Sequence, residues 1–397
     1  MRISTLNFLQ GPVETLARLQ SDVQRTQTEV ATGTRLRSPA DDPVAAGRVQ
    51  ELERWLLSAE QQARNSELLA GRLGLQETAL ADATEILQRV RELALQAGNG
   101  AFDEGTRRML ATEVRSRAEL LLQVANRRSP SGDHVFAGGK SATQPFARLQ
   151  GGIVYAGDDT LRDIEVAPGQ RITDGLSGAD LFIRVPAGNG SFAMRAAPGN
   201  AGTGVLGEGS VVVPSEWVAD TYTVEFGPGG AWEARDTDGA LVASGVRTGG
   251  EAIGFRGIRL ALDGDPAAGD RFFVESGGTE DMFRTLDRLA DALEAPVGDG
   301  ARRAAVANEV NAVLRQLEPS LERLINVRSV LGARLNAIDY ATAAREALRE
   351  DVTTNLSQLR DTDMAEALTR LNMQMTGLQA AQQSYARLSR LSLFDYL

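Results

Sequence analysis

Residues 32–46, TGTRLRSPADDPVAA, separate two helical patterns near the N-terminus and decide how the chain begins. Gly33 stands where a glycine commonly ends a helix. Pro43 lacks an amide N–H and would destabilise a helix interior, but proline is favoured at the first helical position. Asp42 directly precedes it and has the side chain of a good N-cap. This pattern predicts that one helix ends at Gly33 and a second begins at Pro43.

The acidic pair Asp41–Asp42 could also be read as a catalytic or metal-binding site. A metal site needs further ligands, and none is visible nearby in the sequence. Asp41 is favoured near the positive end of a helix, with Arg35 or Arg37 close to it. We therefore interpret the pair as a helix start within a linker.

The helical pattern before this linker has a narrow apolar stripe. Leu6 and Val13 lie in one row of the stripe. Further along, the same row contains the polar residues Gln20 and Gln27. The other row repeats every seven residues, at Leu9, Leu16, Val23 and Val30. Two apolar rows in a heptad are typical of a coiled-coil seam.

The C-terminal third of the chain has stripes of the same kind. One row repeats every seven residues, at Val310, Leu317, Leu324, Leu331 and Ile338. A later row advances by four and three residues, at Met364, Leu368, Leu371, Met375 and Leu378, with Gln382 and Tyr385 continuing it. A further run, earlier in the chain, has leucine every seven residues, at Leu73, Leu80 and Leu87. For residues 43–130 and 285–350 an ordinary helical-bundle core explains such stripes at least as well as a coiled coil.

The terminal stripes are too narrow to stabilise a single helix. Burying one Leu or Val side chain contributes about 1.5–3 kcal/mol, whereas ordering each backbone residue costs about 1–2 kcal/mol. An isolated helix of this length is marginal in water. The terminal segments therefore need a partner stripe, either the other terminus or a neighbouring copy.

The middle of the chain is typical of β structure. Segments such as DTYTVEFG (220–227) and DRFFVESGG (270–278) are short, rich in β-branched or aromatic residues, and bounded by Gly or Asp. DTDGA (236–240) carries the Asp-Gly hairpin signal. We predict an α+β multidomain protein in which long N- and C-terminal helices pair as a coiled coil or bundle, with an antiparallel β-sandwich or barrel-like domain inserted.

These patterns give expected domain boundaries. Residues 1–37 and 352–397 form terminal coiled-coil segments that are disordered or labile before assembly. Residues 38–140 and 281–351 form a helical rod domain, and residues 141–280 form the β-rich outer domain.

Composition excludes several classes of function. The net charge of −11 and pI of about 4.9 argue against nucleic-acid binding, which needs basic stripes. There is no cysteine and a single histidine, so thiolate chemistry and Cys- or His-pair zinc sites are excluded. We find no secretory signal peptide and no apolar run long enough to span a membrane.

Two motifs resemble nucleotide-binding loops but lack the required context. Gly202-x-Gly204-x-x-Gly207 is followed by a strand pattern, whereas a dinucleotide loop must open a helix. HVFAGGKS (134–141) has His134 where a phosphate-binding loop needs glycine. We find no catalytic, cofactor or metal constellation and expect a protein that is not an enzyme.

Three segments resemble bacterial flagellins, and more closely the hook–filament junction members of that family. TEVATGTRLRSPADDPVAA (28–46) is similar to the N-terminal flagellin signature, and LQETALADATEILQRVRELALQAGNG (75–100) to the helix after it. RLNMQMTGLQAAQQSYARLSRLSLFDYL (370–397) resembles the C-terminal helix of the family. HVFAGGKSATQPF (134–146), the start MRIST and the ending SLFDYL resemble the junction members, although these often have tyrosine where His134 stands.

The resemblance implies a structural adaptor outside the cell. Copies of the chain would form a ring between hook-associated protein 1 and flagellin, at the hook–filament junction. Export would use the flagellar type III apparatus, with a chaperone holding the C-terminal segment and no cleaved signal peptide. The resemblance implies neither a cofactor, nor nucleic-acid binding, nor membrane insertion.

Two other functions fit the sequence less well. The chain could be a flagellin, the subunit of the filament itself. It could also be an adhesin or enzyme carried on a flagellin-like frame, but residues 141–280 show no convergent acid, base or metal set.

Overall fold

The structure is a computed structural model that describes residues 3–98 and 103–390, with side chains described from Gly11 to Gly98 and from Asp103 to Arg387. The chain divides into two compact units. The first combines Met1–Arg64 with Ala341–Leu397, and the second is Asn65–Tyr340. Two long helices, α2 (Pro43–Gly98) and α5 (Gly300–Arg360), contribute residues to both units.

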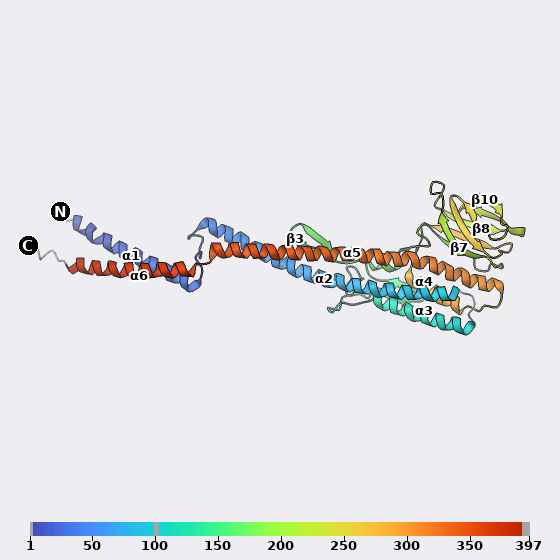
Figure 1. Ribbon diagram of the computed structural model, residues 1–397, viewed down its shortest axis with the longest axis horizontal. Helices are drawn as coiled ribbons and strands as arrows, with labels where there is room; N and C mark the ends of the chain where they lie inside the picture. Colours follow the sequence, from blue (N-terminus) through green and yellow to red (C-terminus); the bar gives the residue numbers. More distant parts are fainter. Residues whose placement is uncertain (1–2, 99–102, 391–397) are drawn as a thin grey trace, which may run out of the picture. The chain divides into compact units, whose positions relative to one another are not determined.

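The first unit contains both terminal helices, α1 (Ile3–Thr32) and α6 (Met364–Arg390). They lie side by side, as Figure 1 shows. The beginning of α2 and the end of α5 also meet in this unit, where Arg360 and Glu53 form an ion pair of 3.7 Å. Segments from opposite ends of the sequence therefore form one unit.

In the second unit, ion pairs connect α2 to α5, and α3 (Glu104–Ala125) packs against α4 (Met282–Glu294). The expected apolar stripes form the core. Leu73, Leu80 and Leu87 of α2 are fully buried, as are Leu324 and Leu331 of α5. Ion pairs flank this core at 2.8 Å between Arg91 and Glu318 and between Arg328 and Glu77.

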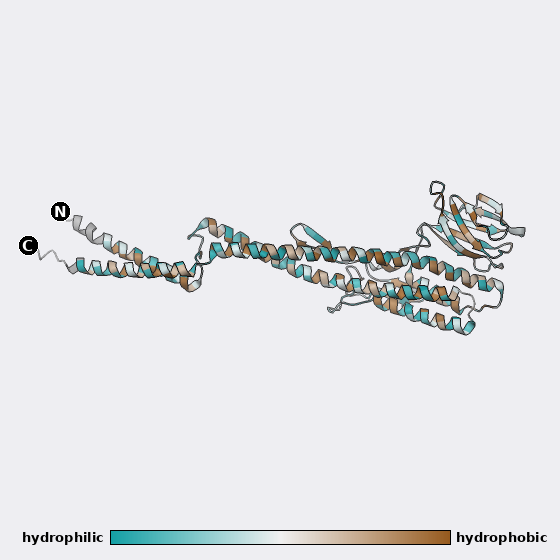
Figure 2. Ribbon diagram, viewed as in Figure 1, coloured by the Kyte–Doolittle hydropathy of each residue, from teal (hydrophilic) through white to brown (hydrophobic). Residues whose placement is uncertain are grey.

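The β-rich part is a sandwich of two antiparallel sheets. One sheet has the strand order β10 (Leu241–Val246), β9 (Ala231–Arg235), β8 (Thr221–Phe226), β13 (Arg271–Ser276) and β6 (Phe192–Ala196). The other has the order β11 (Ile253–Phe255), β12 (Ile258–Asp263) and β7 (Val205–Val211). Figure 2 shows the apolar strand residues of this part. Their inner faces share one core that includes Tyr222, Phe255 and Phe272.

The remaining short elements connect the helices to the sandwich. Three two-stranded ladders pair β1 (Phe146–Leu149) with β2 (Gly152–Tyr155), β3 (Asp163–Ala167) with β4 (Gln170–Thr173), and β5 (Val185–Pro186) with β14 (Thr279–Glu280). The helical turns η1 (Ala179–Ile183) and η2 (Pro228–Gly230) complete the elements. An aromatic cluster lies beside η1, in which the ring centroids of Phe146 and Phe182 are 5.5 Å apart.

The segment HVFAGGKSATQPF contributes to this aromatic cluster and has a structural role. Gly138 has φ +64°, and a Cβ there would lie 2.0 Å from the carbonyl oxygen of Asp158. The amide of the next residue, Gly139, donates to the Asp158 carboxylate at 2.6 Å. The loop amide is therefore bonded to a carboxylate of the same chain, and the loop does not open a helix, as a phosphate-binding loop must.

The dinucleotide-like glycines at 202–207 also surround an internal acid. The buried carboxylate of Asp270 accepts hydrogen bonds from the amides of Ala201 at 2.7 Å, Gly202 at 3.0 Å and Ala267 at 2.9 Å. Strand β7 follows, as the sequence predicts. Backbone N–H groups that could bind a phosphate are thus used within the fold.

The predicted fold class is confirmed: paired N- and C-terminal helices flank an inserted antiparallel β domain. Within residues 3–98 and 103–390, no helix has the length and apolar character that a membrane crossing requires.

Candidate assembly interface on the terminal helices

The contact between α1 and α6 has the periodicity of a coiled-coil seam. The less exposed positions of α1 advance by three and four residues, at Leu16, Leu19, Val23, Thr26 and Val30. Those of α6 do the same, at Ala367, Leu371, Gln374, Leu378, Ala381 and Tyr385. Because the two helices contact each other, these rows form the seam between them.

The structure places about half of the sequence-predicted interaction residues in this seam. They are Leu16, Val23, Val30, Leu371, Leu378 and Tyr385. The others with described side chains are exposed, namely Val13, Met364, Leu368 and Met375. Leu6 and Leu9 lie in α1, but their side chains are outside the described residues, as are residues 391–397 of the C-terminal motif.

Sequence reasoning missed the second row of each seam because most of its residues are small or polar. In α1 this row contains Leu19 and Thr26, where the apolar pattern suggested Val13. In α6 it contains Ala367, Gln374 and Ala381, which also repeat every seven residues. A search for heptads that admits Ala, Thr and Gln would have found this row.

A charged residue, Glu29, lies in the α1–α6 seam near the C-terminal end of α1. The side chain of Glu29 is only 8% exposed and pairs with Arg370 of α6 at 3.2 Å and with Arg25 of α1 at 3.5 Å. A buried carboxylate is costly unless it is paired, so the contact with Arg370 favours one register of α6 against α1. Arg370 is thus an interface residue that sequence reasoning did not identify.

The two linkers that lead into the terminal helices are hydrogen-bonded to each other. Thr362 N–H donates to the carbonyl of Gly33 at 2.9 Å, and Arg35 N–H donates to the carbonyl of Arg360 at 2.8 Å. The Arg35 guanidinium also donates to the carbonyl of Leu359 at 3.0 Å. Gly33 ends α1 with φ +68°, a conformation that favours glycine. We call residues 33–36 and 359–362 the joint.

The acidic pair lies at the start of α2. Oδ1 of Asp42 accepts from the amides of Val44 at 3.1 Å and Ala45 at 3.0 Å, and α2 begins at Pro43. Oδ2 of Asp41 accepts from the backbone amides of Ser38 and Arg37, and the Ser38 hydrogen bond is the main cause that lowers the pKa of Asp41.

The arginine that pairs with Asp41 is Arg25 of α1, at 3.2 Å, whereas the sequence pointed to Arg35 or Arg37. The part of the chain that the structure describes contains no group of three or more His, Asp or Glu side chains that could hold a metal ion.

An apolar row remains exposed on α6 beside the seam. Met364, Leu368 and Met375 share one flank, and Met373 is also exposed. Large exposed apolar side chains that recur along a helix often mark an interaction surface. The described residues of a single chain leave this row uncovered, so it is available to a neighbouring molecule.

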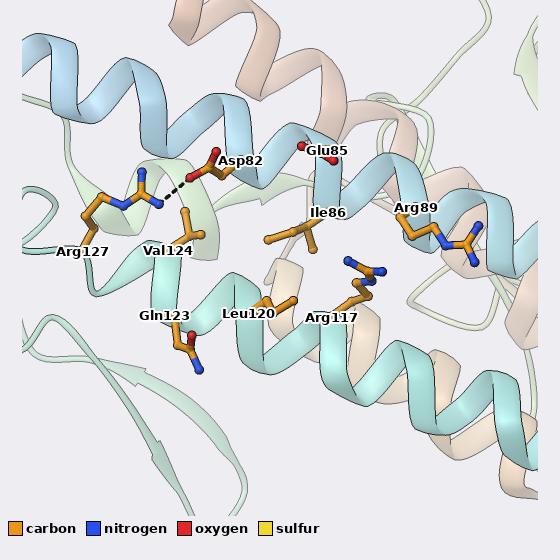
Figure 3. A pocket seen from close by; sticks show the side chains of 9 residues that line it. All are labelled: Asp82, Glu85, Ile86, Arg89, Arg117, Leu120, Gln123, Val124 and Arg127. Atoms are coloured by element: carbon orange, nitrogen blue, oxygen red, sulfur yellow. Dashed lines mark hydrogen bonds and ion pairs between the residues drawn. The ribbon is translucent and has the colours of Figure 1, made fainter.

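A groove between α2 and α3 of the second unit encloses about 450 Å³ and is shown in Figure 3. Ile86, Leu120 and Val124 lie between the helices, and Arg127 pairs with Asp82 at one end. Arg89 pairs with Glu113 at 2.9 Å. Asp82 and Glu113 are thus each paired with an arginine, as in ion pairs that support the packing of two helices.

Comparison with known proteins identifies related chains. The bacterial flagellin N-terminal helical region matches residues 3–141, and the bacterial flagellin C-terminal helical region matches residues 314–397. Flagellar hook-associated protein 3 of Escherichia coli strain K12 is 23% identical over 402 residues, covering 100% of this chain and 99% of that protein.

Two solved structures are similar over most of the chain. FlgL of Xanthomonas campestris is 33% identical with a TM-score of 0.74, covering 77% of this chain and 99% of that one. The flagellar junction protein FlgL of Legionella pneumophila is 31% identical with a TM-score of 0.72, covering 79% of this chain and 99% of that one.

Proposed function

Because the chain belongs to the flagellar hook-associated protein 3 family of flagellin-like proteins, we propose that copies of it form a ring that joins the flagellar filament to the hook. The protein is a structural component of the hook–filament junction and belongs to a non-enzymatic family. The ring, its neighbours and its route out of the cell are our proposals. The neighbours are hook-associated protein 1 on the hook side and flagellin on the filament side.

The observation that carries this proposal is the α1–α6 pair with its exposed apolar flank. The seam covers one flank of α6, whereas Met364, Leu368 and Met375 remain uncovered on the neighbouring flank. An amphipathic helix with two apolar flanks can contact two partners. We propose that α1 of the same chain covers one flank and a neighbouring subunit covers the other.

A ring of this kind needs contacts that join unlike surfaces. Heterologous contacts in a helical lattice can stack without closing, so the same subunit can meet one protein below and another above. We propose that the terminal segments, residues 1–37 and 352–397, make the inner contacts and are labile before assembly. The rod domain (38–140 and 281–351) and the β domain (141–280) make up the rest of the subunit, and we propose that the β domain is the outer part of the ring.

Export of the chain in an unfolded state is consistent with the marginal stability of the terminal helices. A narrow seam with Thr26, Glu29 and Gln374 in it buries little apolar area for each ordered residue. We propose that the chain leaves the cell unfolded through the flagellar type III apparatus, with an export chaperone bound to the C-terminal segment. The terminal helices would then pair only when the subunit reaches the junction.

The test is complementation in a host strain that lacks its own copy of the gene. Expression of this chain should restore filaments on bare hooks, and immunogold labelling should locate the protein only between hook and filament. Labelling along the whole filament, or polymerisation of the purified chain into long filaments, would instead identify a flagellin. Bare hooks in the native host with flagellin in the medium would refute the adaptor function.

A further inference from the structure

One face of α5 hydrogen-bonds the backbone of the β sandwich within the second unit. The residues on this face are Asn308, Asn311, Arg315 and Gln316, and each donates to a main-chain carbonyl of residues 186–207. The spacing of three and four residues places Asn308, Asn311 and Arg315 on one side of the helix, and Gln316 lies at the margin of that side. We call this set of contacts the polar seam.

The polar seam covers a free edge of the sandwich. Among the described strands, β7 is the last of its sheet and pairs only with β12. Asn308 accepts from the amide of Leu206 at 2.7 Å and donates to the carbonyl of Gly204 at 2.8 Å, and Asn311 donates to the carbonyl of Leu206 at 3.0 Å. Both backbone polar groups of Leu206 are therefore satisfied by helix side chains, as a further strand would satisfy them.

Arg315 extends these contacts from one sheet to the other. Its guanidinium donates to the carbonyls of Gly207 in β7 at 2.9 Å and of Met194 in β6 at 3.3 Å. Among the described residues no carboxylate lies within ion-pair distance of it. Burial lowers the pKa of Arg315 to about 10, so the group is still a cation at neutral pH. A partly buried cation is tolerated only where acceptors meet its N–H groups, and the backbone of the sandwich supplies them.

A second set of contacts binds α5 to residues 186–188, the segment that leads into the sandwich. Gln316 is buried, accepts from the amide of Gly188 at 2.7 Å and donates to the carbonyl of Pro186 at 3.1 Å. An ion-pair network lies nearby, in which Arg288 of α4 bridges Glu280 and Glu309, and Glu280 also pairs with Arg195 of β6. Polar groups thus join α5 to the sandwich at several separate points.

The apolar core of the sandwich contains no residue of α5. All residues of that core, including those packed at its margin, lie between Phe192 and Val274. The polar seam therefore adds hydrogen bonds of fixed geometry but little apolar burial. Hydrogen bonds weaken steeply with misalignment, whereas apolar contacts tolerate sliding, so this arrangement is suited to fixing an orientation.

We propose that Asn308 and Arg315 are positioning residues, which hold the edge of β7 against α5 and so fix the direction in which the β sandwich projects from the helices. The role goes beyond the proposed junction function, because it concerns a single chain before assembly. It also explains why a helix of a structural protein has amides and an arginine on an inner face.

The test measures the distance between α5 and the sandwich in the purified chain. Because the protein has no cysteine, Ala305→Cys on α5 and Ser244→Cys on β10 would carry the only two spin labels, both at exposed positions. Double electron–electron resonance should give one narrow distance distribution. In the Asn308→Leu/Arg315→Met double variant the distribution should become at least twice as broad, and Arg315→Lys should retain more of the narrow population than Arg315→Met.

Arg349→Met is the matched control, since Arg349 is an exposed arginine of the same helix, and it should leave the distribution unchanged. Fluorescence of Trp217 and Trp232 reports whether the sandwich stays folded. An unchanged distribution in the folded double variant would overturn the proposal. Loss of the folded tryptophan signal would overturn it as well, because the polar seam would then be part of the folding core.

Discussion

The amide of Thr362 donates a hydrogen bond to the carbonyl of Gly33 at 2.9 Å, and this contact joins the two linkers that precede α6 and follow α1. The joint therefore holds the end of α1 next to the start of α6. With Arg35 bonded to Arg360 in the same joint, the relative register of α1 and α6 is set before their seam begins. The seam then needs only a few apolar contacts to hold the helices together.

Gly33→Ala should weaken the α1–α6 pair, because Gly33 has φ +68°, which side-chain-bearing residues rarely adopt. The substitution should lower the free energy of opening the α1–α6 pair by about 1 kcal/mol. Gly377→Ala is the matched control, since Gly377 lies inside α6 with open space around it, and alanine there should stabilise the helix by roughly 0.5–1 kcal/mol. Hydrogen exchange of α6 amides measures both effects, and changes of the same sign would contradict the role of the joint.

The pair between Glu29 and Arg370 should couple the two helices energetically. A double-mutant cycle with Glu29→Gln and Arg370→Gln should give a coupling energy of about 1 kcal/mol, because Glu29 is buried although Arg370 is partly exposed. The exposed pair Arg48–Glu51 on α2 should give a coupling close to zero in the same hydrogen-exchange measurement. Equal coupling in both cycles would show that Glu29 does not set the register.

The single histidine should make stability depend on pH. His134 is buried, its Nε2 accepts from Arg128 at 3.1 Å, and burial is the main cause that lowers its pKa below the ordinary 6.5. As the pH falls below about 6.5, the unfolded chain therefore takes up a proton that the folded chain does not. The free energy of unfolding should fall by at most about 1.4 kcal/mol per pH unit from this group.

His134→Gln isolates this contribution, because glutamine retains an acceptor for Arg128 but does not titrate. Denaturant unfolding at about pH 7.5 and pH 5.5 should show a smaller loss of stability in the variant than in the parent chain. Identical losses in both proteins would mean that His134 becomes protonated equally well in the folded state.

Much of the fold could be predicted because short sequence patterns determine where the helices and strands begin and end and which of their faces are buried. The heptad of Leu73, Leu80 and Leu87 fixes which face of α2 is buried, and Asp42 with Pro43 leaves one reasonable start for that helix. The marginal stability of each chain end indicated that it needs a partner stripe, but it left both the other terminus and a neighbouring copy as candidates. The Gly- and Asp-bounded strands could likewise be assigned to an antiparallel domain, but not to a strand order, since pairing depends on contacts that are distant in sequence.

The assembly interface was predicted less completely. Apolar periodicity correctly indicated the helices, but it assigned Leu368 and Met375 to the same role as Leu371 and Leu378. In the structure these residues lie on different flanks, because Ala367 and Gln374 occupy the second row of the seam. A pattern of large apolar residues cannot separate two neighbouring contact surfaces on one helix. The polar seam on α5 could not be predicted from the sequence either. The partners of Asn308 and Arg315 are backbone atoms, which leave no side-chain pattern.

The central claim is that the paired terminal helices carry assembly, and Leu371→Asp tests it most directly. Leu371 lies in the α1–α6 seam, whereas Leu241, on edge strand β10 of the sandwich, is exposed and serves as the matched control. In a native-host strain lacking its own copy, electron microscopy would count hooks that carry filaments. The account predicts bare hooks with Leu371→Asp, normal attachment with Leu241→Asp, and a folded sandwich in both purified proteins. Filaments that remain attached with Leu371→Asp would contradict it.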